Sequence, residues 1–332
     1  MVKLTVLVTG VAGFIGSSIA AALLSRGKTV IGIDSLSDYY DPQLKRRNLL
    51  RLQHPEFHFI HADLNEYDLS NLLEGVDYVF HQAGQPGVRK SWGEEFGTYL
   101  SANVSATQRL LEASKGSSIR RFVYASSSSV YGDAETYPTE ESFLPRPLSP
   151  YGVSKLAAEH LCNLYAANFG VPTVSLRYFT VYGPRQRPDM AFTRFIRAAL
   201  LSQPIEIYGN GKQVRDFTFI DDVVEANLLA AETDHVGSGS VFNIAGGSSV
   251  SVNEVLDLIR EISPHQLDVR YTPGLPGDVK RTGGSISSVQ DDLNWLPRTT
   301  IEDGIRRQFQ WGIDQFTREA EGRPTNANDF WG

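Results

Sequence analysis

Tyr151 and Lys155 lie four positions apart, and their types and spacing are those of residues that could catalyse a reaction. They open a stretch with helical periodicity, residues 151–169, and a spacing of four places both side chains on one face of a helix. A lysine cation beside a phenol favours the phenolate and lowers a pKa that is ordinarily about 10. The pair is therefore expected to supply a base that takes a proton from a hydroxyl group.

A run of four serines, Ser126–Ser129, gives this base a partner. The run directly follows Arg121–Ala125, a short apolar stretch that is typical of a strand in a buried sheet. The hydroxyl of Ser127 is therefore expected at the carboxyl end of a strand, beside Tyr151. There it can form a hydrogen bond to the reacting oxygen.

Three glycines, Gly10, Gly13 and Gly16, separate the first apolar run from the first helical stretch. A pyrophosphate binds to backbone N–H groups at a helix N-terminus, where a Cβ atom would intrude. The spacing is one residue longer than the standard dinucleotide fingerprint, but a strand before and a helix after are both present. We expect this loop, with Phe14 and Ile15, to bind a dinucleotide cofactor.

Acidic residues after the second and third apolar runs indicate which dinucleotide that is. An acid at Asp34 accepts hydrogen bonds from the adenosine 2′-hydroxyl and repels a 2′-phosphate, which favours NAD over NADP. The basic run Lys45–Arg47 could instead hold a 2′-phosphate, although such a run is more often a solvated helix face. Asp63 is expected to meet the adenine edge or to cap its own segment, and Lys155 to hold the nicotinamide ribose.

The elements that must position these residues alternate along the first two-thirds of the chain. Short, nearly continuous apolar runs are typical of buried strands, and helical stretches lie between them at 14–26, 66–74, 95–115 and 151–169. This alternation predicts an α/β fold, a Rossmann-type doubly wound parallel sheet, followed by a smaller α/β lobe. We expect a cofactor domain of residues 1–182, to which 217–250 return, and a substrate lobe of residues 183–216 and 251–332.

Composition argues against several other classes of protein. The 332 residues carry a formal net charge of −7 and no long basic run, so no nucleic-acid partner is expected. The single cysteine, Cys162, excludes an intrachain disulfide and a cysteine metal cage, and we expect no metal site. No apolar run approaches the roughly 18 residues of a membrane span, and the N-terminus leaves no room for a signal peptide. We therefore expect a cytoplasmic protein without membrane contact.

The glycine loop and the residues Ser127, Tyr151 and Lys155 together resemble the motifs of the extended short-chain dehydrogenase/reductases, in particular the nucleotide-sugar epimerases and dehydratases. The resemblance covers roughly residues 3–312. It implies tightly held NAD, Tyr151 as the base on a sugar hydroxyl and Ser127 as its partner. It also implies a homodimer in which the helices near 95–115 and 151–169 pair into a four-helix bundle. With all three residues intact, a non-catalytic NAD-binding module of this fold is disfavoured.

The residues after Ser127 narrow the reaction. Dehydratases of this family carry Asp-Glu there, and UDP-glucuronate decarboxylases carry a Glu just before the Val, whereas this chain has Ser128 and Ser129. The segment Thr180–Ala191 is similar to that of UDP-glucuronate 4-epimerases. The resemblance therefore implies C4 epimerisation of a UDP-sugar, from UDP-glucuronate to UDP-galacturonate through a 4-keto intermediate. UDP-glucose 4-epimerisation and UDP-glucuronate decarboxylation stay open as alternatives.

Such an intermediate is a β-keto acid that tends to lose CO2, so its carboxylate must be restrained. Ser128, Ser129 and Thr180 offer neutral hydroxyls for this purpose, and Arg185 offers a bidentate cation. At the nucleotide end, the resemblance matches Arg215, Asp278 and Arg281 to positions that usually meet the nucleoside diphosphate. Arg89 could approach the sugar or the diphosphate.

Overall fold

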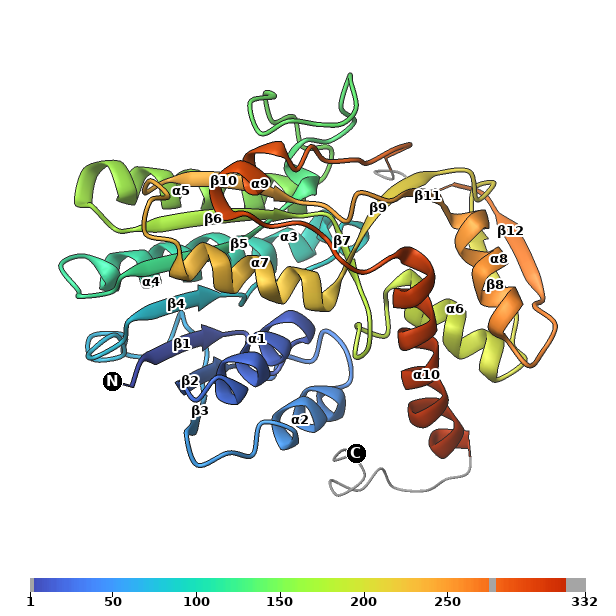
Figure 1. The fold of residues 1–332 in the computed structure, drawn as a ribbon, viewed down its shortest axis with the longest axis horizontal. Helices are drawn as coiled ribbons and strands as arrows, with labels where there is room; N and C mark the ends of the chain where they lie inside the picture. The colour runs from blue at the N-terminus through green and yellow to red at the C-terminus, as the bar shows by residue number, and fades with distance from the viewer. Residues whose placement is uncertain (1–2, 275–278, 321–332) are drawn as a thin grey trace.

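The large sheet at the centre of the structure is entirely parallel, as the alternation of apolar runs and helical stretches predicts (Figure 1). The computed structural model describes residues 3–274 and 279–320. In spatial order the seven strands are β10 (Ser240–Ile244), β6 (Thr173–Tyr178), β5 (Arg121–Ser127), β4 (Tyr78–His81), β1 (Thr5–Thr9), β2 (Thr29–Asp34) and β3 (Phe57–His61).

Helices cover both faces of this sheet. Because successive side chains of a strand point to opposite faces, Val6 and Val8 of β1 pack on one side with α1 (Phe14–Ser25) and α7 (Ile220–Glu232). Leu7 packs on the other side with α4 (Ala106–Ser114) and α5 (Pro150–Phe169). Both sides of β1 are buried, which confirms the doubly wound α/β fold.

A smaller lobe lies beside the carboxyl end of the sheet (Figure 1). It contains the three-stranded sheet of β7 (Thr180–Tyr182), β9 (Val214–Phe219) and β11 (Ser249–Ser251), and the pair β8 (Ile205–Tyr208) and β12 (Val269–Thr272). Its helices are α6 (Ala191–Leu200), α8 (Val252–Ile262) and α10 (Ile301–Ala320). The chain returns to the large sheet at β10, while the division into two domains stays a prediction.

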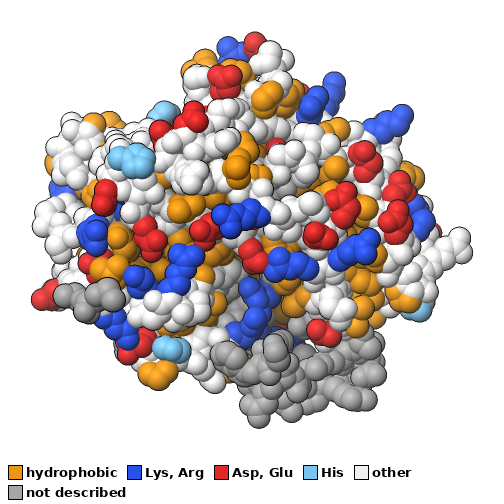
Figure 2. Space-filling model, in the orientation of Figure 1, with side chains coloured by type: hydrophobic (Ala, Val, Ile, Leu, Met, Phe, Trp, Pro, Cys, Tyr) orange, Lys and Arg blue, Asp and Glu red, His pale blue; other side chains and the backbone are white. Residues whose placement is uncertain are grey.

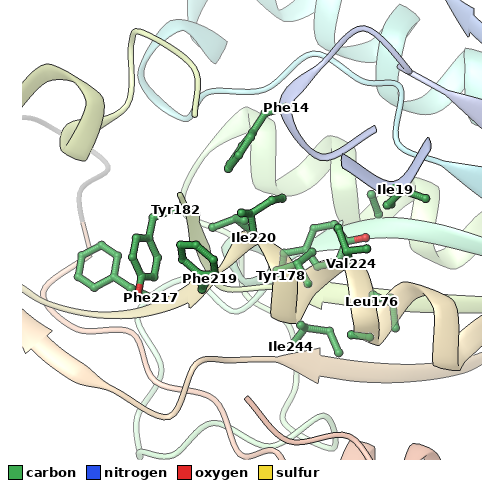
Figure 3. Close-up of a cluster of buried hydrophobic side chains, with 14 of the residues drawn as sticks. Phe14, Ile19, Leu176, Tyr178, Tyr182, Phe217, Phe219, Ile220, Val224 and Ile244 are labelled. Carbon is green, nitrogen blue, oxygen red and sulfur yellow. The ribbon is translucent and has the colours of Figure 1, made fainter. Parts of the chain in front are cut away.

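Apolar side chains run without interruption from the large sheet into this lobe (Figure 3). Tyr182 meets Phe217 and Phe219 edge to face, with ring centroids 6.2 and 5.4 Å apart. Ile220, at the start of α7, continues the cluster toward Phe14 of α1. The junction between the two parts is therefore a packed core.

The start of α5 is fixed against the serine run. Ser149 caps the helix by accepting a hydrogen bond from the backbone N–H of Gly152 (3.1 Å), and Pro150 occupies the first turn, where its missing N–H costs nothing. A Cβ at Gly152 would lie 2.5 Å from the carbonyl oxygen of Ser129. This close approach brings the first turn of α5, with Tyr151, against the residues that follow β5.

Four segments differ from the sequence expectations. Residues 66–74 form successive turns instead of a helix. Asp68 accepts a hydrogen bond from the N–H of Ser70, which stabilises a turn, and Leu72 and Leu73 are buried although they lie in turns. Residues 95–115 are divided into α3 (Phe96–Tyr99), a π-helix (Leu100–Ser105) and α4. Two helices were not expected, α2 (Pro42–Leu50) and α9 (Ser287–Leu293).

The rest of the described chain contains short 3₁₀ turns, η1 (Arg89–Ser91), η2 (Gly93–Glu95) and η4 (Ser128–Val130). No helix in residues 3–274 and 279–320 is long and apolar enough to cross a lipid bilayer. On the face shown in Figure 2, acidic and basic side chains are interspersed.

Candidate active site

A cavity of about 590 Å³ extends from the glycine loop to the start of α5. Its volume lies within the range of about 300–1,000 Å³ that is usual for small-molecule sites. One part of its wall contains all the residues expected to bind the cofactor's phosphates and adenosine, namely Gly10, Gly13, Phe14, Ile15, Gly16, Asp34 and Asp63. Tyr151 and Lys155 line the same cavity, so the structure brings the two predicted groups together.

The glycine loop leaves no space for side chains. Gly10 has a φ of +66°, and a Cβ there would lie 2.7 Å from the backbone nitrogen of Ala83. A Cβ on Gly16 would overlap the carbonyl oxygen of Gly10. Gly13 precedes α1 without a side-chain cap, which leaves the first N–H groups of the helix available to an anion. The loop therefore fits the pyrophosphate of a dinucleotide.

Asp34 and its neighbours form the adenosine end of the cavity. Its carboxylate accepts hydrogen bonds from the N–H groups of Ala12 (3.0 Å) and Leu36 (2.8 Å), which orient it beside the loop. Lys45 also lines this end and donates to the hydroxyl of Ser37 (2.9 Å). Asp63 lines the cavity, and it also caps its own segment by accepting a hydrogen bond from the N–H of Asn65.

Tyr151, Ser127 and Lys155 form the reacting end. The side chains of Tyr151 and Ser127 share a hydrogen bond. Burial raises the pKa of Tyr151, and this bond and the charge of Arg187 lower it only in part, so the lowering expected from Lys155 is absent here. Burial lowers the pKa of Lys155 to about 8, and its Nζ donates to the carbonyl oxygen of Ala125 (2.9 Å).

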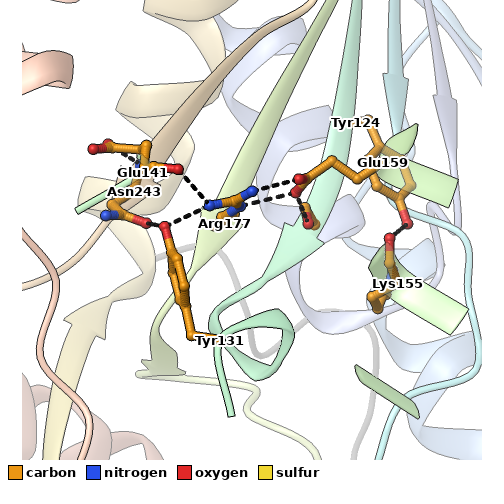
Figure 4. Close-up of polar contacts among 8 residues, drawn as sticks. Tyr124, Tyr131, Glu141, Lys155, Glu159, Arg177 and Asn243 are labelled. Carbon is orange, nitrogen blue, oxygen red and sulfur yellow. Dashed lines mark hydrogen bonds and ion pairs between the residues drawn. The ribbon is translucent and has the colours of Figure 1, made fainter. Parts of the chain in front are cut away.

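A buried ion pair ties α5 to the sheet (Figure 4). Glu159 accepts hydrogen bonds from Nε and Nη2 of Arg177 (3.0 and 2.6 Å) and from the hydroxyl of Ser126 (2.6 Å). Nη1 of Arg177 donates to the hydroxyl of Tyr131 (2.6 Å), which donates to Asn243 Oδ1 (2.7 Å). The network joins α5, β5, β6 and β10 around the residue that precedes Ser127.

A buried histidine links the end of β1, directly before the glycine loop, to α4. His81 lies between the hydroxyls of Thr9 (2.7 Å) and Thr107 (2.9 Å). Because Thr107 donates its own proton to the carbonyl oxygen of Asn103 (2.6 Å), it must accept one from Nε2 of His81, and Nδ1 then accepts from Thr9. Burial lowers the pKa of His81 to about 3, so the ring is a neutral structural link.

Asn103 of the π-helix connects the cavity floor to α5. Its Oδ1 accepts from the N–H of Gln85 (2.7 Å), and its Nδ2 donates to the carbonyl oxygen of Gln85 (3.1 Å) and the hydroxyl of Ser154 (2.9 Å). Ser154 in turn donates to the carbonyl oxygen of Tyr151 (2.8 Å). The widened helical turn thus places one amide where it fixes both the cofactor cavity and the catalytic helix.

The arginine that lines the cavity is Arg187, for which no role was expected, and not Arg185. Arg185, the expected carboxylate ligand, has a φ of +71° and donates through Nη2 to the hydroxyl of Ser18 (3.1 Å); it does not line the cavity. Arg187 lines it instead and pairs with Asp189 through Nε and Nη2 (3.0 and 2.9 Å). Burial lowers the pKa of Arg187, but the bonds to Asp189 outweigh this and raise it overall.

The sequence interpretation missed two tyrosines, one that lines this end of the cavity and one that packs against Tyr151. Tyr39 lines the wall, with the guanidinium of Arg187 5.9 Å from its ring centroid. Tyr99 lies edge to face with Tyr151, with centroids 6.2 Å apart, and donates to the carbonyl oxygen of Gly87 (2.8 Å). The segment that contains Tyr39 resembles the epimerases, but nothing in its pattern pointed to Tyr39 itself.

The other expected substrate residues lie near the site without lining this cavity. Ser128 and Ser129 form η4 directly after Ser127, whose Oγ accepts a hydrogen bond from the N–H of Ser129 (3.2 Å). Thr180 begins β7 and pairs in register with Phe217 of β9. Ser129 therefore lies against the first turn of α5, whereas Thr180 belongs to the three-stranded sheet of the smaller lobe.

Candidate nucleotide residues come from both parts of the molecule. The guanidinium of Arg89 lies 4.5 Å from the ring centroid of Tyr208, that of Arg281 lies 5.0 Å from Tyr137, and Nη1 of Arg215 donates to the carbonyl oxygen of Val214 (2.9 Å). Asp278 lies outside the described residues. Arg194, which was not anticipated, also approaches the ring of Tyr208 (5.8 Å).

Comparisons with known proteins agree with this geometry. The chain matches the family described as NAD dependent epimerase/dehydratase over residues 6–245. It is 45% identical to an uncharacterized UDP-glucose epimerase of Bacillus subtilis (92% of this chain, 97% of the relative), and 37% identical to a UDP-glucuronate 4-epimerase of Thermodesulfobacterium geofontis (92% and 95%). The crystal structure of UDP-glucuronic acid 4-epimerase from Bacillus cereus with UDP-glucuronic acid and NAD superposes with a TM-score of 0.91, at 42% identity over 94% of this chain and 100% of that one.

Proposed function

The chain belongs to the NAD dependent epimerase/dehydratase family, and we propose that it is an NAD-dependent isomerase that inverts C4 of UDP-glucuronate to give UDP-galacturonate. The cofactor and the sugar are those named for the Bacillus cereus enzyme, which resembles this chain over nearly its whole length. The observation that favours a sugar with a carboxylate is the position of Arg187. This cation lies on the cavity wall, and its charge lowers the pKa of Tyr151.

The chain's own residues account for the proton transfer. NAD, when bound, accepts the hydride from C4 and returns it to the opposite face of the sugar. Tyr151 takes the proton of the 4-hydroxyl and returns it after the 4-keto sugar has turned in the site. Ser127, hydrogen-bonded to Tyr151, holds the reacting oxygen. The cation whose charge lowers the pKa of Tyr151 is Arg187, and we assign Lys155, whose Nζ donates to the carbonyl oxygen of Ala125, to the nicotinamide ribose.

The same site must protect a β-keto acid from losing CO2. Decarboxylation needs the breaking C–C bond to overlap the carbonyl π system, so a carboxylate held out of that orientation is retained. We assign this restraint to Arg187, in place of the Arg185 expected from the sequence, together with the hydroxyls of Ser128, Ser129 and Thr180. A cation also stabilises the carboxylate itself and so opposes loss of its charge.

The proposal is tested by incubating the purified protein with UDP-glucuronate and NAD and following the products by mass spectrometry and NMR. A product of unchanged mass with an inverted C4 signal is expected, and loss of CO2 would contradict the role given to Arg187 and the serines. Tyr151→Phe is expected to abolish turnover and to keep NAD binding. An active Tyr151→Phe enzyme would exclude the proposed base.

UDP-glucose 4-epimerisation is the second candidate, and one contact favours it. Asp189 pairs with Nε and Nη2 of Arg187, which reduces the positive charge that a substrate carboxylate would meet. The name of the Bacillus subtilis relative points the same way. Measuring kcat/KM for UDP-glucose and UDP-glucuronate side by side decides between the two sugars.

We propose that the nucleotide end of the substrate binds where the two parts meet. Arg89 comes from the large domain, whereas Arg215 and Arg281 come from the other side, so a diphosphate between them would bridge the parts. This fits a cofactor domain of residues 1–182 and 217–250 and a substrate lobe of 183–216 and 251–332. Limited proteolysis with and without UDP-glucose tests that division.

We also propose a homodimer through the helices of residues 95–115 and 151–169. Val153 and Leu164, three helical turns apart on α5, are 45% and 56% exposed, and Leu100 of the π-helix is 41% exposed. A second copy would remove these side chains from water. Light scattering is expected to give a dimer, and Val153→Glu with Leu164→Glu a monomer; an unchanged mass for that variant would place the contact elsewhere.

Finally, we propose that the protein acts in the cytoplasm. Cys162 is a buried free thiol, which suits a reducing compartment. Fractionation of cells that express the chain with a tag tests this assignment.

A further inference from the structure

We propose that Asp216 is a positioning residue for the nucleotide of the substrate, because its buried carboxylate ties together the backbone segments that carry Arg215 and Arg281. The inference rests on the proposed function, in which these two arginines hold the diphosphate. Asp216 itself does not line the cavity and touches no reacting atom.

The carboxylate joins three parts of the chain. Asp216 lies in β9 and is only 2% exposed. Its Oδ1 accepts a hydrogen bond from the N–H of Gly246 (2.8 Å), in the turn after β10, and its Oδ2 accepts from the N–H of Gly284 (3.4 Å). Its own N–H donates to the hydroxyl of Thr282 (3.2 Å). One side chain therefore fixes β9 to the end of the large sheet and to residues 280–285.

The same segments carry the two arginines at neighbouring backbone positions. Val214 donates its N–H to the carbonyl oxygen of Lys280 and accepts from the N–H of Thr282, both at 3.1 Å, so Arg281 lies opposite Val214. Arg215 follows Val214 directly, and strand alternation turns its side chain to the face opposite Asp216. Loss of the hydrogen bonds to Asp216 would therefore shift the backbone that carries both arginines.

The glycines that donate to Asp216 are sterically required. A Cβ on Gly246 would overlap the carbonyl oxygen of Phe217, and a Cβ on Gly284 would lie 2.7 Å from the ring of Phe179. The peptide N–H groups can reach the carboxylate because these residues have no side chain. Three backbone segments are packed closely around one carboxylate, which holds them together; we call this set of contacts the Asp216 tether.

The tether depends on the charge state of the carboxyl group. Burial raises the pKa of Asp216 to about 6, and the N–H groups of Gly284, Gly246 and Gly247 hold it from rising further. Within the described residues, no charged side chain contributes to this pKa. The charged residues of the two segments are Arg215 on β9 and Lys280 and Arg281 on the adjoining one, while β7 and β11 carry only hydroxyl and apolar side chains.

Protonation of Asp216 removes one of the two hydrogen bonds that its carboxylate accepts from Gly246 and Gly284. A protonated carboxyl oxygen becomes a donor that faces a peptide N–H, so it can no longer accept that bond. An asparagine side chain has the same fault at every pH, because its amide NH2 must face one of the two N–H groups. Asp216→Asn therefore reproduces the low-pH state of the wild-type residue with almost no change in size.

The test measures UDP-glucose binding by calorimetry between pH 5 and 8, in the Tyr151→Phe background so that no turnover occurs. UDP-glucose is used because its diphosphate diester does not titrate in this range. With Asp216 present, affinity is expected to fall below about pH 6. With Asp216→Asn, affinity at pH 8 is expected to fall by about tenfold or more and to be flat with pH. Asp221→Asn, at an exposed residue of α7 paired with Arg307, is the matched control and keeps the pH dependence.

Kinetics with the otherwise wild-type enzyme separate positioning from general damage. Asp216→Asn is expected to raise KM by the same factor, to change kcat by less than about threefold and to leave NAD affinity unchanged. Equal affinities with and without the Asp216→Asn substitution at pH 8, or pH-independent binding with Asp216 present, would overturn the inference; the second result decides the matter even if the variant fails to fold. Absence of any UDP-glucose or UDP-glucuronate binding would overturn the proposed function along with it.

Discussion

The ion pair between Glu159 and Arg177 gives the sharpest prediction of stability. Their side chains are 2% and 5% exposed, and Glu159 accepts three hydrogen bonds, two from Arg177 and one from Ser126. Glu159→Gln removes the negative charge and leaves the buried guanidinium without its counter-ion. Removing one member of a buried pair typically costs about 3–5 kcal/mol.

That cost converts into a measurable change of melting temperature. A chain of 332 residues unfolds with an entropy of about 0.7 kcal/mol/K, so the loss corresponds to a Tm lower by about 4–7 °C. Differential scanning calorimetry of the cofactor-free protein measures it. Asp268→Asn, which removes one partner of the exposed pair with Arg270, is the control and is expected to leave Tm unchanged within error.

A double variant tests the explanation. Because replacing both members of a buried pair by apolar residues avoids the unpaired charge, Glu159→Leu with Arg177→Met is expected to be more stable than either single variant. If Glu159→Gln melts within about 1 °C of the wild type, or if the double variant is the least stable of the set, the cost does not come from an unpaired buried charge and the reasoning is wrong.

Three further predictions concern the site. Arg187→Gln is expected to raise KM for UDP-glucuronate by about tenfold or more while that for UDP-glucose hardly changes, and the matched Arg185→Gln moves neither; initial rates on both sugars measure this, and equal effects of the two variants would refute the assignment. Gly16→Ala places a Cβ against the carbonyl oxygen of Gly10, so calorimetry is expected to show NAD affinity reduced at least about tenfold, and wild-type affinity would contradict the close-packed loop. Burial lowers the pKa of Lys155 from 10.5 to about 8, so the unfolded chain binds more protons than the folded one between these values and stability rises with pH across that window. Chemical denaturation from pH 8 to 10 is expected to show this rise in the wild type and its loss in Lys155→Met.

The parts of the site that depend on local spacing were predictable. Gly10, Gly13 and Gly16 need only a strand before and a helix after them, and Tyr151 and Lys155 need only one helical turn. These residues meet in one cavity because the carboxyl ends of parallel strands share one edge of the sheet. The strands of the large sheet followed from their apolar runs, whereas the short strands β7 and β11 were not expected.

Arg185 and Arg187 show what the sequence could not specify. Both stand in the same short segment, and which of them faces the cavity is set by a left-handed backbone at Arg185, a conformation that an arginine seldom adopts. Nothing in the pattern of residue types signals that turn.

The expected helix at 66–74 failed for a different reason. Its leucines do recur at helical spacing, but they are buried from turns whose backbone is held by side chains such as Asp68. Periodicity records which residues are buried and leaves the backbone path undetermined. α2 was overlooked although Asp41 and Pro42 give its start, because its charged sequence lacks an apolar stripe.

The links through His81 and Asn103 have an evolutionary consequence. Because they join β1, the π-helix and α5 through residues of the large domain alone, these links position the glycine loop and the Tyr151–Lys155 pair without a contact from the smaller lobe. Recognition of the sugar and the nucleotide can therefore drift, or be redesigned, by changes in residues 180–190 and in the segments around Asp216.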